Sequence, residues 1–338
     1  MKKHFTVLIL LAALVSCGPR IIYPHLEWLI PWYISDYISL DDRQKNMLEE
    51  RLLKQLDWHC RTQMATYAQT LRAIGRDFAG DTHPIGYAMI RSYVNQLMIL
   101  WQKLLKQIAP DITDILLTAS DSQIAELFGN LEGQNQKLKE QYVDPQPGEL
   151  DENRQNRMIK RLKYWISSLT QEQKAAVSAW SSQLVPIAED WLQNRELIQA
   201  EAHRLLTRAK TNPALRSSLE ALIIHSERMR SLAYQQKIDI NTGITIRFLM
   251  KMDELLSPRQ RTYLIKRIES LATDFDKLNC DSRDKPSGGS GVPFFVLQAS
   301  QGMQRFRVIG GGICGFEFGS FGYSNLFRIS CFELRILC

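Results

Sequence analysis

The sequence lacks the short motifs that mark most metal and catalytic sites. It has no Cys-x-x-Cys pair, so neither a zinc site nor a thioredoxin-like redox pair is supported. No His-Glu-x-x-His occurs, and the 6 histidines are scattered, so metal chemistry has no support. A Gly-x-Ser-x-Gly nucleophile elbow and a phosphate-binding loop are also missing. We therefore expect no catalytic set, no metal and no cofactor.

One glycine-rich segment matches a dinucleotide-binding pattern without the structure that the pattern requires. Residues 310–315, Gly-Gly-Gly-Ile-Cys-Gly, satisfy Gly-x-Gly-x-x-Gly and follow a short apolar run. A nucleotide fingerprint needs a helix directly after the glycines and a βαβ unit around them. Residues 316–319, Phe-Glu-Phe-Gly, do not have the pattern of a helix. We therefore reject a nucleotide site here.

The charged residues do not gather into one basic stripe. The chain has 42 Lys and Arg against 36 Asp and Glu, a net charge of +6 spread along its length. A nucleic-acid-binding protein usually concentrates its basic residues on one face, so we expect no nucleic-acid partner. The remaining composition, 45% hydrophobic and 23% charged, is that of an ordinary globular protein.

The only long apolar run stands at the start of the chain, and it is too short for a transmembrane helix. Residues 1–4 carry positive charge, and residues 5–15 are almost wholly apolar. A membrane-spanning helix needs about 20 apolar residues, whereas Gly18-Pro19-Arg20 ends this run early. A charged start followed by a short apolar run is typical of a secretory signal peptide, which we assign to residues 1–16.

The end of this run, Leu14-Val15-Ser16-Cys17, resembles the lipobox of bacterial lipoproteins. The resemblance implies cleavage before Cys17 and attachment of acyl chains to that cysteine, which makes a membrane the first expected partner. Each buried methylene contributes about 0.8 kcal/mol, so two or three chains anchor a protein firmly. Gly18 follows the cysteine where retention in the inner membrane usually shows Asp. The resemblance therefore implies the outer membrane, with the protein body facing the periplasm.

Six cysteines are present, and removing the lipid site Cys17 leaves an odd number: Cys60, Cys280, Cys314, Cys331 and Cys338. The periplasm permits disulfides, but no pairing follows from these spacings. We favour two structural thiols and a scattered set in the tail.

Apolar residues recur at helical spacing from about residue 43 to 278. They follow one another at steps of three and four, and no long stretch alternates with period two. The longest such series runs through Leu48, Leu52, Leu56, Cys60, Met64, Tyr67, Leu71, Ile74 and Phe78. We predict an all-α protein, an elongated bundle of about seven to nine helices.

Proline- and glycine-containing segments are expected to separate the helices. They lie at 80–84, 109–111 and 144–148, and the last is the strongest interruption. We place a first helical half at 41–142, a hinge at 143–157 and a second half at 158–280. Residues 17–40 then form an aromatic-rich anchor segment.

A short pattern recurs four times: an apolar residue, a helix-capping residue and, three residues later, Gln. The capping residues are Asp41, Ser120, Thr170 and Ser257. The spacing predicts capping boxes, in which the two side chains satisfy free amides at a helix start. The pattern is also similar to the Leu-Thr-x-x-Gln motif of Spy- and CpxP-type periplasmic chaperones, which would imply a helical cradle for unfolded clients.

The chain changes character from Lys285 onward, and we assign 281–338 to a glycine-rich linker and an atypical tail that is non-helical or disordered. Residues 286–291, Pro-Ser-Gly-Gly-Ser-Gly, have the composition of a flexible linker, and 8 of the 13 Phe follow them. Two interpretations remain, a short β-prone appendage or a sequence translated past a frameshift. We favour the frameshift because the tail agrees with no single secondary structure.

The segment after Cys17 resembles a family of Gram-negative lipoproteins that has no assigned function. Its opening, Tyr23-x-x-x-x-Trp28-Leu29-x-x-Trp32-x-x-x-Asp36-Tyr37, and the later pair Trp58-His59 carry the resemblance. The likeness extends over about residues 17–278 and implies an all-helical fold without implying a reaction. Members of that family have Arg directly after the Trp-His pair, where this chain has Cys60.

The aromatic segment and His59 are the candidate binding residues. Trp28, Trp32, Tyr33 and Tyr37 suit either a membrane-facing belt or packing against the body, and we favour packing. For His59 we favour a place at a helix surface or in a core network, since Asp57 lies two positions away and faces another side of a helix. We therefore name Trp28, Trp32, Tyr37, Trp58 and His59 as possible partner-binding residues.

Two functions remain open. The first is a non-enzymatic, lipid-anchored periplasmic protein that binds another envelope protein or an unfolded client through a helical groove. The alternative is an enzyme of cell-wall or lipid metabolism with His59 in its active site. A weaker third is a structural lipoprotein that touches wall polymer through basic residues.

Overall fold

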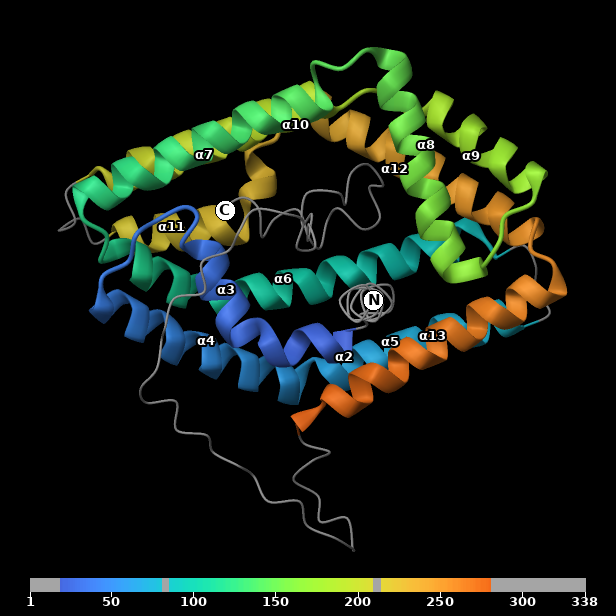
Figure 1. Ribbon diagram of the computed structural model, residues 1–338, viewed down its shortest axis with the longest axis horizontal. Coiled ribbons are helices and arrows are strands. Elements are labelled where there is room, and N and C mark those ends of the chain that lie inside the picture. The colour runs from blue at the N-terminus through green and yellow to red at the C-terminus, as the bar shows by residue number, and fades with distance from the viewer. Residues whose placement is uncertain (1–18, 81–84, 209–213, 281–338) are drawn as a thin grey trace, which may run out of the picture.

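The computed structural model shows helices packed in pairs around a central helix, α6 (Figure 1). It describes residues 19–80, 85–208 and 214–280, and it contains no β-strand within them. The predicted signal peptide 1–16, Cys17, the glycine pattern at 310–315 and the tail lie outside the described residues. The all-α prediction is confirmed.

The described residues form eleven α-helices of nine residues or more, rather than the predicted seven to nine. A four-residue turn, α2 (Pro19–Ile22), and the 3₁₀ turns η1 (Tyr23–His25) and η2 (Ser226–Met229) complete them. The helices are α3 (Leu26–Ile34), α4 (Asp42–Thr62), α5 (Met64–Ala79), α6 (Tyr87–Leu117), α7 (Asp121–Tyr142), α8 (Pro147–Ile166), α9 (Gln171–Gln183), α10 (Ala188–Leu206), α11 (Ala214–Ile224), α12 (Leu232–Glu254) and α13 (Pro258–Leu278).

The first apolar stripe is divided between two helices. At Gln63 φ widens to −111°, so α4 ends at Thr62 and α5 begins at Met64. The two helices have different neighbours, since α4 packs on α3 and α6 whereas α5 packs on α13. One straight helix cannot follow both sets of neighbours, which is why the uninterrupted sequence pattern ends at Gln63.

The break predicted at 109–111 is wrong, because α6 continues through Pro110. A proline inside a helix removes one backbone hydrogen bond and costs about 3 kcal/mol. Packing on both sides of it offsets that cost: Leu105, Ala109 and Thr113 are all buried, and Ala109 and Thr113 have 0% exposure. Tertiary burial therefore outweighs local preference here.

Four helix pairs connect the two predicted halves of the chain. They are α5 with α13, α6 with α11, α6 with α12 and α7 with α10, and each joins a helix from 41–142 to one from 158–280 (Figure 1). The predicted hinge contains the turn from Tyr142 to Pro147 and the first turns of α8. Movement of the two halves about this turn stays a prediction.

Two large hydrophobic clusters support the pairs. One gathers side chains of α7, α10 and α11 around Tyr37 and Ile38. The other joins α8, α9, α12 and α13, and Leu71 and Phe78 of α5 pack against it. None of the helices described is both long and apolar enough to cross a membrane.

All four predicted capping boxes are present. The N-cap side chains of Asp41, Ser120, Thr170 and Ser257 each accept a hydrogen bond from the backbone N–H three residues later. In return, the Gln at that position accepts from the N–H of the cap, at Oε1 distances of 2.9–3.1 Å. The sequence pattern therefore located the starts of α4, α7, α9 and α13.

The same glutamines also join the helix starts in pairs. Gln44 and Gln123 exchange two hydrogen bonds, Nε2 to Oε1, at 3.1 and 2.7 Å. Gln173 and Gln260 do the same at 2.9 Å in both directions. Each Nε2 also donates to a backbone carbonyl two residues before the partner's cap, such as Ser39 for Gln123. Two equivalent junctions, α4 with α7 and α9 with α13, follow from one repeated motif.

Candidate functional site: the N-terminal segment

Residues 19–40, which we call the N-terminal segment, connect the predicted lipid site to the helical body. The segment contains α2, η1 and α3, and it starts two residues after Cys17. Contacts with α13 and α4 hold α2 and α3 respectively (Figure 1). Its side chains divide between an inward face, which contacts the helical body, and an outward face, which points away from it.

His59 joins the start of this segment to α4 and α5. The Tyr23 hydroxyl donates to the Leu56 carbonyl at 3.0 Å, so its oxygen accepts from the Nδ1–H of His59 at 3.1 Å. The bare Nε2 then accepts from the Tyr67 hydroxyl at 3.0 Å. The Tyr23 and His59 rings stack at 5.7 Å between centroids, and Tyr67 packs edge-on against Phe275. Both ring nitrogens of His59 are therefore occupied by tyrosines.

Burial sets the protonation states of this network. Desolvation lowers the pKa of His59 to about 4, because the charged imidazolium loses its water. The same cause raises the pKa of Tyr67 to about 12. At neutral pH the imidazole is therefore uncharged and the Tyr67 hydroxyl keeps its proton. A general acid–base needs a free nitrogen within reach of its substrate, which this arrangement does not provide.

A disulfide lies directly beside the histidine. Cys60, 2% exposed at the end of α4, is bonded to Cys280, with a Cα–Cα distance of 5.5 Å. We expected two structural thiols and no pairing, and this expectation is wrong, because Cys60 and Cys280 are joined. The bond closes a loop with a sequence separation of 220, and it fixes the end of α13 against the α4–α5 corner that holds Tyr23.

The far end of the segment is built into the core. Tyr37 and Ile38 are each 8% exposed within the α7–α10–α11 cluster. The Ser39 N–H and hydroxyl donate to the Glu126 carboxylate at 2.9 and 2.6 Å, and these hydrogen bonds lower the pKa of Glu126. Asn130 donates to the Tyr37 carbonyl at 2.9 Å. Both ends of the segment are thus hydrogen-bonded to the body.

The tryptophans of α3 lie on the opposite face. Trp28 is 55% exposed and Trp32 is 61% exposed, so packing is the wrong expectation for these two side chains and the right one for Tyr37. Their spacing of four residues places both on one side of the helix, and the His25 ring lies 6.1 Å from that of Trp28. Trp58 is half-buried beside His59, at 6.2 Å between ring centroids.

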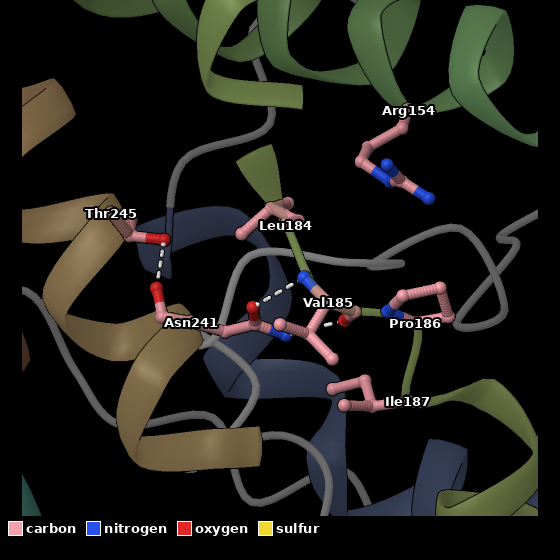
Figure 2. Close-up of a pocket in the computed structure, with 7 residues that line it drawn as sticks. All are labelled: Arg154, Leu184, Val185, Pro186, Ile187, Asn241 and Thr245. Carbon is pink, nitrogen blue, oxygen red and sulfur yellow. Dashed lines mark hydrogen bonds between the residues drawn. The ribbon is translucent and has the colours of Figure 1, made fainter. Parts of the chain in front are cut away.

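A small pocket lies elsewhere, between Arg154 of α8, the link from α9 to α10, and Asn241 and Thr245 of α12 (Figure 2). The amide of Asn241 accepts from the Val185 N–H at 2.9 Å and donates to its carbonyl at 2.8 Å, which fixes the extended link to α10. The Arg154 guanidinium points toward this link and donates to Ser181. None of the predicted binding residues lines the pocket. Within the described ranges, no group of three His, Cys, Asp or Glu side chains is arranged to hold a metal ion.

The fold and the site define a disulfide-bonded, all-helical protein with an ordered N-terminal segment. Residues 36–235, more than half of the chain, match the model of a family described as "Family of unknown function (DUF6279)". The chain belongs to this family. Comparison with curated proteins and with solved structures finds no match. The matched range contains Trp58, His59 and Cys60, whereas Trp28, Trp32 and Cys280 lie outside it.

Sequence reasoning missed three parts of this site. Tyr67 was one member of an apolar stripe, Cys280 one of several cysteines, and Glu126 an ordinary helical carboxylate. Each contacts the N-terminal segment, or the corner that holds it, from more than 80 residues away or through another helix. The one available signal was Cys60, which directly follows the Trp58-His59 pair.

Proposed function

We propose that this chain is a lipid-anchored, non-enzymatic protein of the bacterial envelope. Its signal peptide would be removed before Cys17, and acyl chains on Cys17 would hold it to the outer membrane with its body in the periplasm. The lipobox resemblance supports the anchor. The Cys60–Cys280 bond supports export, because disulfides persist in oxidising compartments such as the periplasm.

The single observation that carries the proposal is that the ordered body begins two residues after Cys17. Tyr23 is already hydrogen-bonded to α4 at its hydroxyl, and the segment that follows packs along the body to Tyr37 and Ser39. A lipoprotein on a long flexible linker can sample a wide volume. This body is instead held close to the bilayer at one fixed corner, which suits a protein that presents a binding surface at the membrane.

The binding role rests on exposed apolar side chains of the helical body. Leu232 is 75% exposed, Ile99 68% and Ile240 50%, on the contacting helices α6 and α12. Exposed apolar side chains on paired helices suit contact with another envelope protein or with an unfolded client. The occupied nitrogens of His59 are the reason we favour binding over the enzymatic alternative.

Membrane fractionation of full-length variants tests the anchor. Cys17→Ala removes the acylation site, and Ser16→Ala is the matched control, because it keeps a small residue before the cysteine. We expect the Cys17→Ala protein to leave the membrane fraction, and globomycin to block processing of the wild type. Membrane retention of Cys17→Ala, or processing that globomycin does not affect, would contradict the anchor.

Site-specific photocrosslinking in intact cells tests the binding role. A crosslinker at position 99 or 232 is expected to capture one recurrent envelope protein or unfolded outer-membrane clients. The matched position is Lys54, which is also exposed but lies on α4. Equal adduct patterns from all three positions would contradict a specific surface on α6 and α12.

A further inference from the structure

The outward face of α3 carries two large aromatic side chains that the body leaves more than half exposed. Trp28 and Trp32 are more than half exposed, whereas Tyr33 and Ile34 on the other side of α3 pack against the core cluster. Burying an aromatic side chain of this size removes a large apolar area from water. Two such rings at one helical face are therefore an unpartnered surface.

The short stretch of chain between Cys17 and α3 limits how far this surface can lie from the lipid anchor. Only Gly18 lies between Cys17 and Pro19, and these two residue steps reach at most about 7 Å. From Pro19 the chain is helical through most of its course to Trp28, and nine residues at about 1.5–2 Å each advance roughly 15 Å. With Cys17 acylated, both tryptophans lie within reach of the headgroup layer, where Trp and Tyr are enriched because their rings are amphipathic.

We propose that Trp28 and Trp32 insert into the phospholipid interface beside the lipid anchor and orient the body on the membrane. This inference rests on the proposed function, since it takes the position of the bilayer from acylated Cys17. The described residues up to Ile34 carry one basic side chain, Arg20, and one acidic side chain, Glu27. Insertion by aromatic rings, rather than attraction to anionic lipid, is therefore the contact that this surface favours.

The inward contacts make the insertion an orienting contact rather than a second tether. Tyr23 is fixed to His59 before α3, and Tyr37 and Ser39 are fixed to α7 and its cluster after it. The face of α3 cannot turn without breaking those hydrogen bonds. When the two rings enter the interface, the disulfide corner and the start of α4 take a defined position relative to the bilayer.

Tryptophan fluorescence in vesicles with brominated lipids tests the proposal. The full acylated protein is reconstituted in phosphatidylcholine vesicles brominated near the headgroup or deep in the chains. We expect shallow bromine to quench the wild type more than deep bromine. Trp28→Ala with Trp32→Ala should lose most of that quenching, while the control Trp165→Phe, a half-buried residue of α8, should keep it.

A second measurement uses the full mature chain with Cys17→Ser, which carries no acyl group. Its partition into phosphatidylcholine vesicles should fall about tenfold or more in the double tryptophan variant. Adding an anionic lipid to the vesicles should change the partition of the Cys17→Ser protein little. Unchanged partition or unchanged quenching in that variant would overturn the proposal. So would protection of both tryptophans from acrylamide without lipid, because the tail or a second copy would then cover them.

A failure of the proposed lipid anchor and a failure of tryptophan insertion can be told apart. The mass of the amino terminus reports on the anchor alone. Partition of the Cys17→Ser protein reports on the two rings alone, so a missing lipid and a surface that does not insert give different results.

Discussion

The two faces of the N-terminal segment use the same kinds of residue for opposite purposes. On the inward face Tyr23 and Tyr37 are hydrogen-bonded and packed, and their neighbours are His59 and the α7 cluster. On the outward face Trp28 and Trp32 have more than half of their surface exposed. Aromatic content alone therefore does not predict whether a segment packs in the core or remains exposed for a partner. Position on the helix and the polar groups within reach decide it.

The largest expected effect comes from the disulfide that backs the inward face. Changing both Cys60 and Cys280 to Ser should lower the free energy of unfolding by about 4 kcal/mol, because closing so long a loop restricts the unfolded chain. Urea unfolding of the oxidised wild type and the double variant measures the difference. A loss below about 1 kcal/mol would mean that this corner contributes little to holding the N-terminal segment.

The next largest loss of stability should come from the junction that holds the N-terminal segment to the start of α7. Gln123→Ala removes the hydrogen bonds to Gln44, to the Ser120 N–H and to the Ser39 carbonyl, and should cost about 2–3 kcal/mol. The matched change Gln260→Ala breaks the equivalent junction between the starts of α9 and α13, and its hydrogen-bond partners Ser168 and Gln173 lie outside residues 19–40.

Hydrogen exchange should distinguish these two variants. Gln123→Ala is expected to speed amide exchange in residues 36–40, and Gln260→Ala is expected to leave those amides protected. Equal exchange in the two variants would contradict a specific role of the first junction in holding the segment.

A pH effect of about 2 kcal/mol should come from His59. Its pKa is about 4 in the folded protein and near 6.5 when unfolded. The unfolded state therefore binds the extra proton first as pH falls below 6.5, and stability is lost on acidification. Between pH 7 and pH 5, the wild type should lose about 2 kcal/mol more than His59→Gln, as measured by urea unfolding. Parallel stability curves for the two proteins would show that the imidazole is not buried neutral.

The smallest stability effect is expected on the outward face. Trp28→Ala with Trp32→Ala should change the free energy of unfolding by only about 1 kcal/mol, since more than half of each side chain is already exposed to water. The control pair, Ile99→Ala with Leu232→Ala, removes exposed apolar side chains far from the anchor in sequence and should behave alike in solution. A loss above about 2 kcal/mol for the tryptophan pair would place those rings in the core.

Periodicity and capping predicted much of the fold from the sequence, because both act locally. The helix starts at Asp41, Ser120, Thr170 and Ser257 each follow from a side chain and an amide three residues apart. Local preference failed at Pro110, where burial on both sides keeps α6 continuous. It also failed at Gln63, where neighbours distant in the chain divide one stripe into two helices.

The site was harder to predict than the fold, because its contacts are between residues far apart in the sequence. Nothing local distinguishes Tyr67 as the partner of His59 or Cys280 as the partner of Cys60. Likewise, the exposure of Trp28 depends on what α4 and α7 leave uncovered. The capping glutamines show both cases, since their bonds within each helix start were predictable and their exchange between helices was not.

Intact-mass and amino-terminal peptide analysis of the mature protein, isolated from membranes of a Gram-negative host, would show whether Cys17 carries the lipid anchor. We predict a chain that starts at Cys17 and carries a diacylglyceryl group on its sulfur. A mature chain that begins elsewhere, or a Cys17 without lipid, would contradict the placement of this body at the bilayer surface.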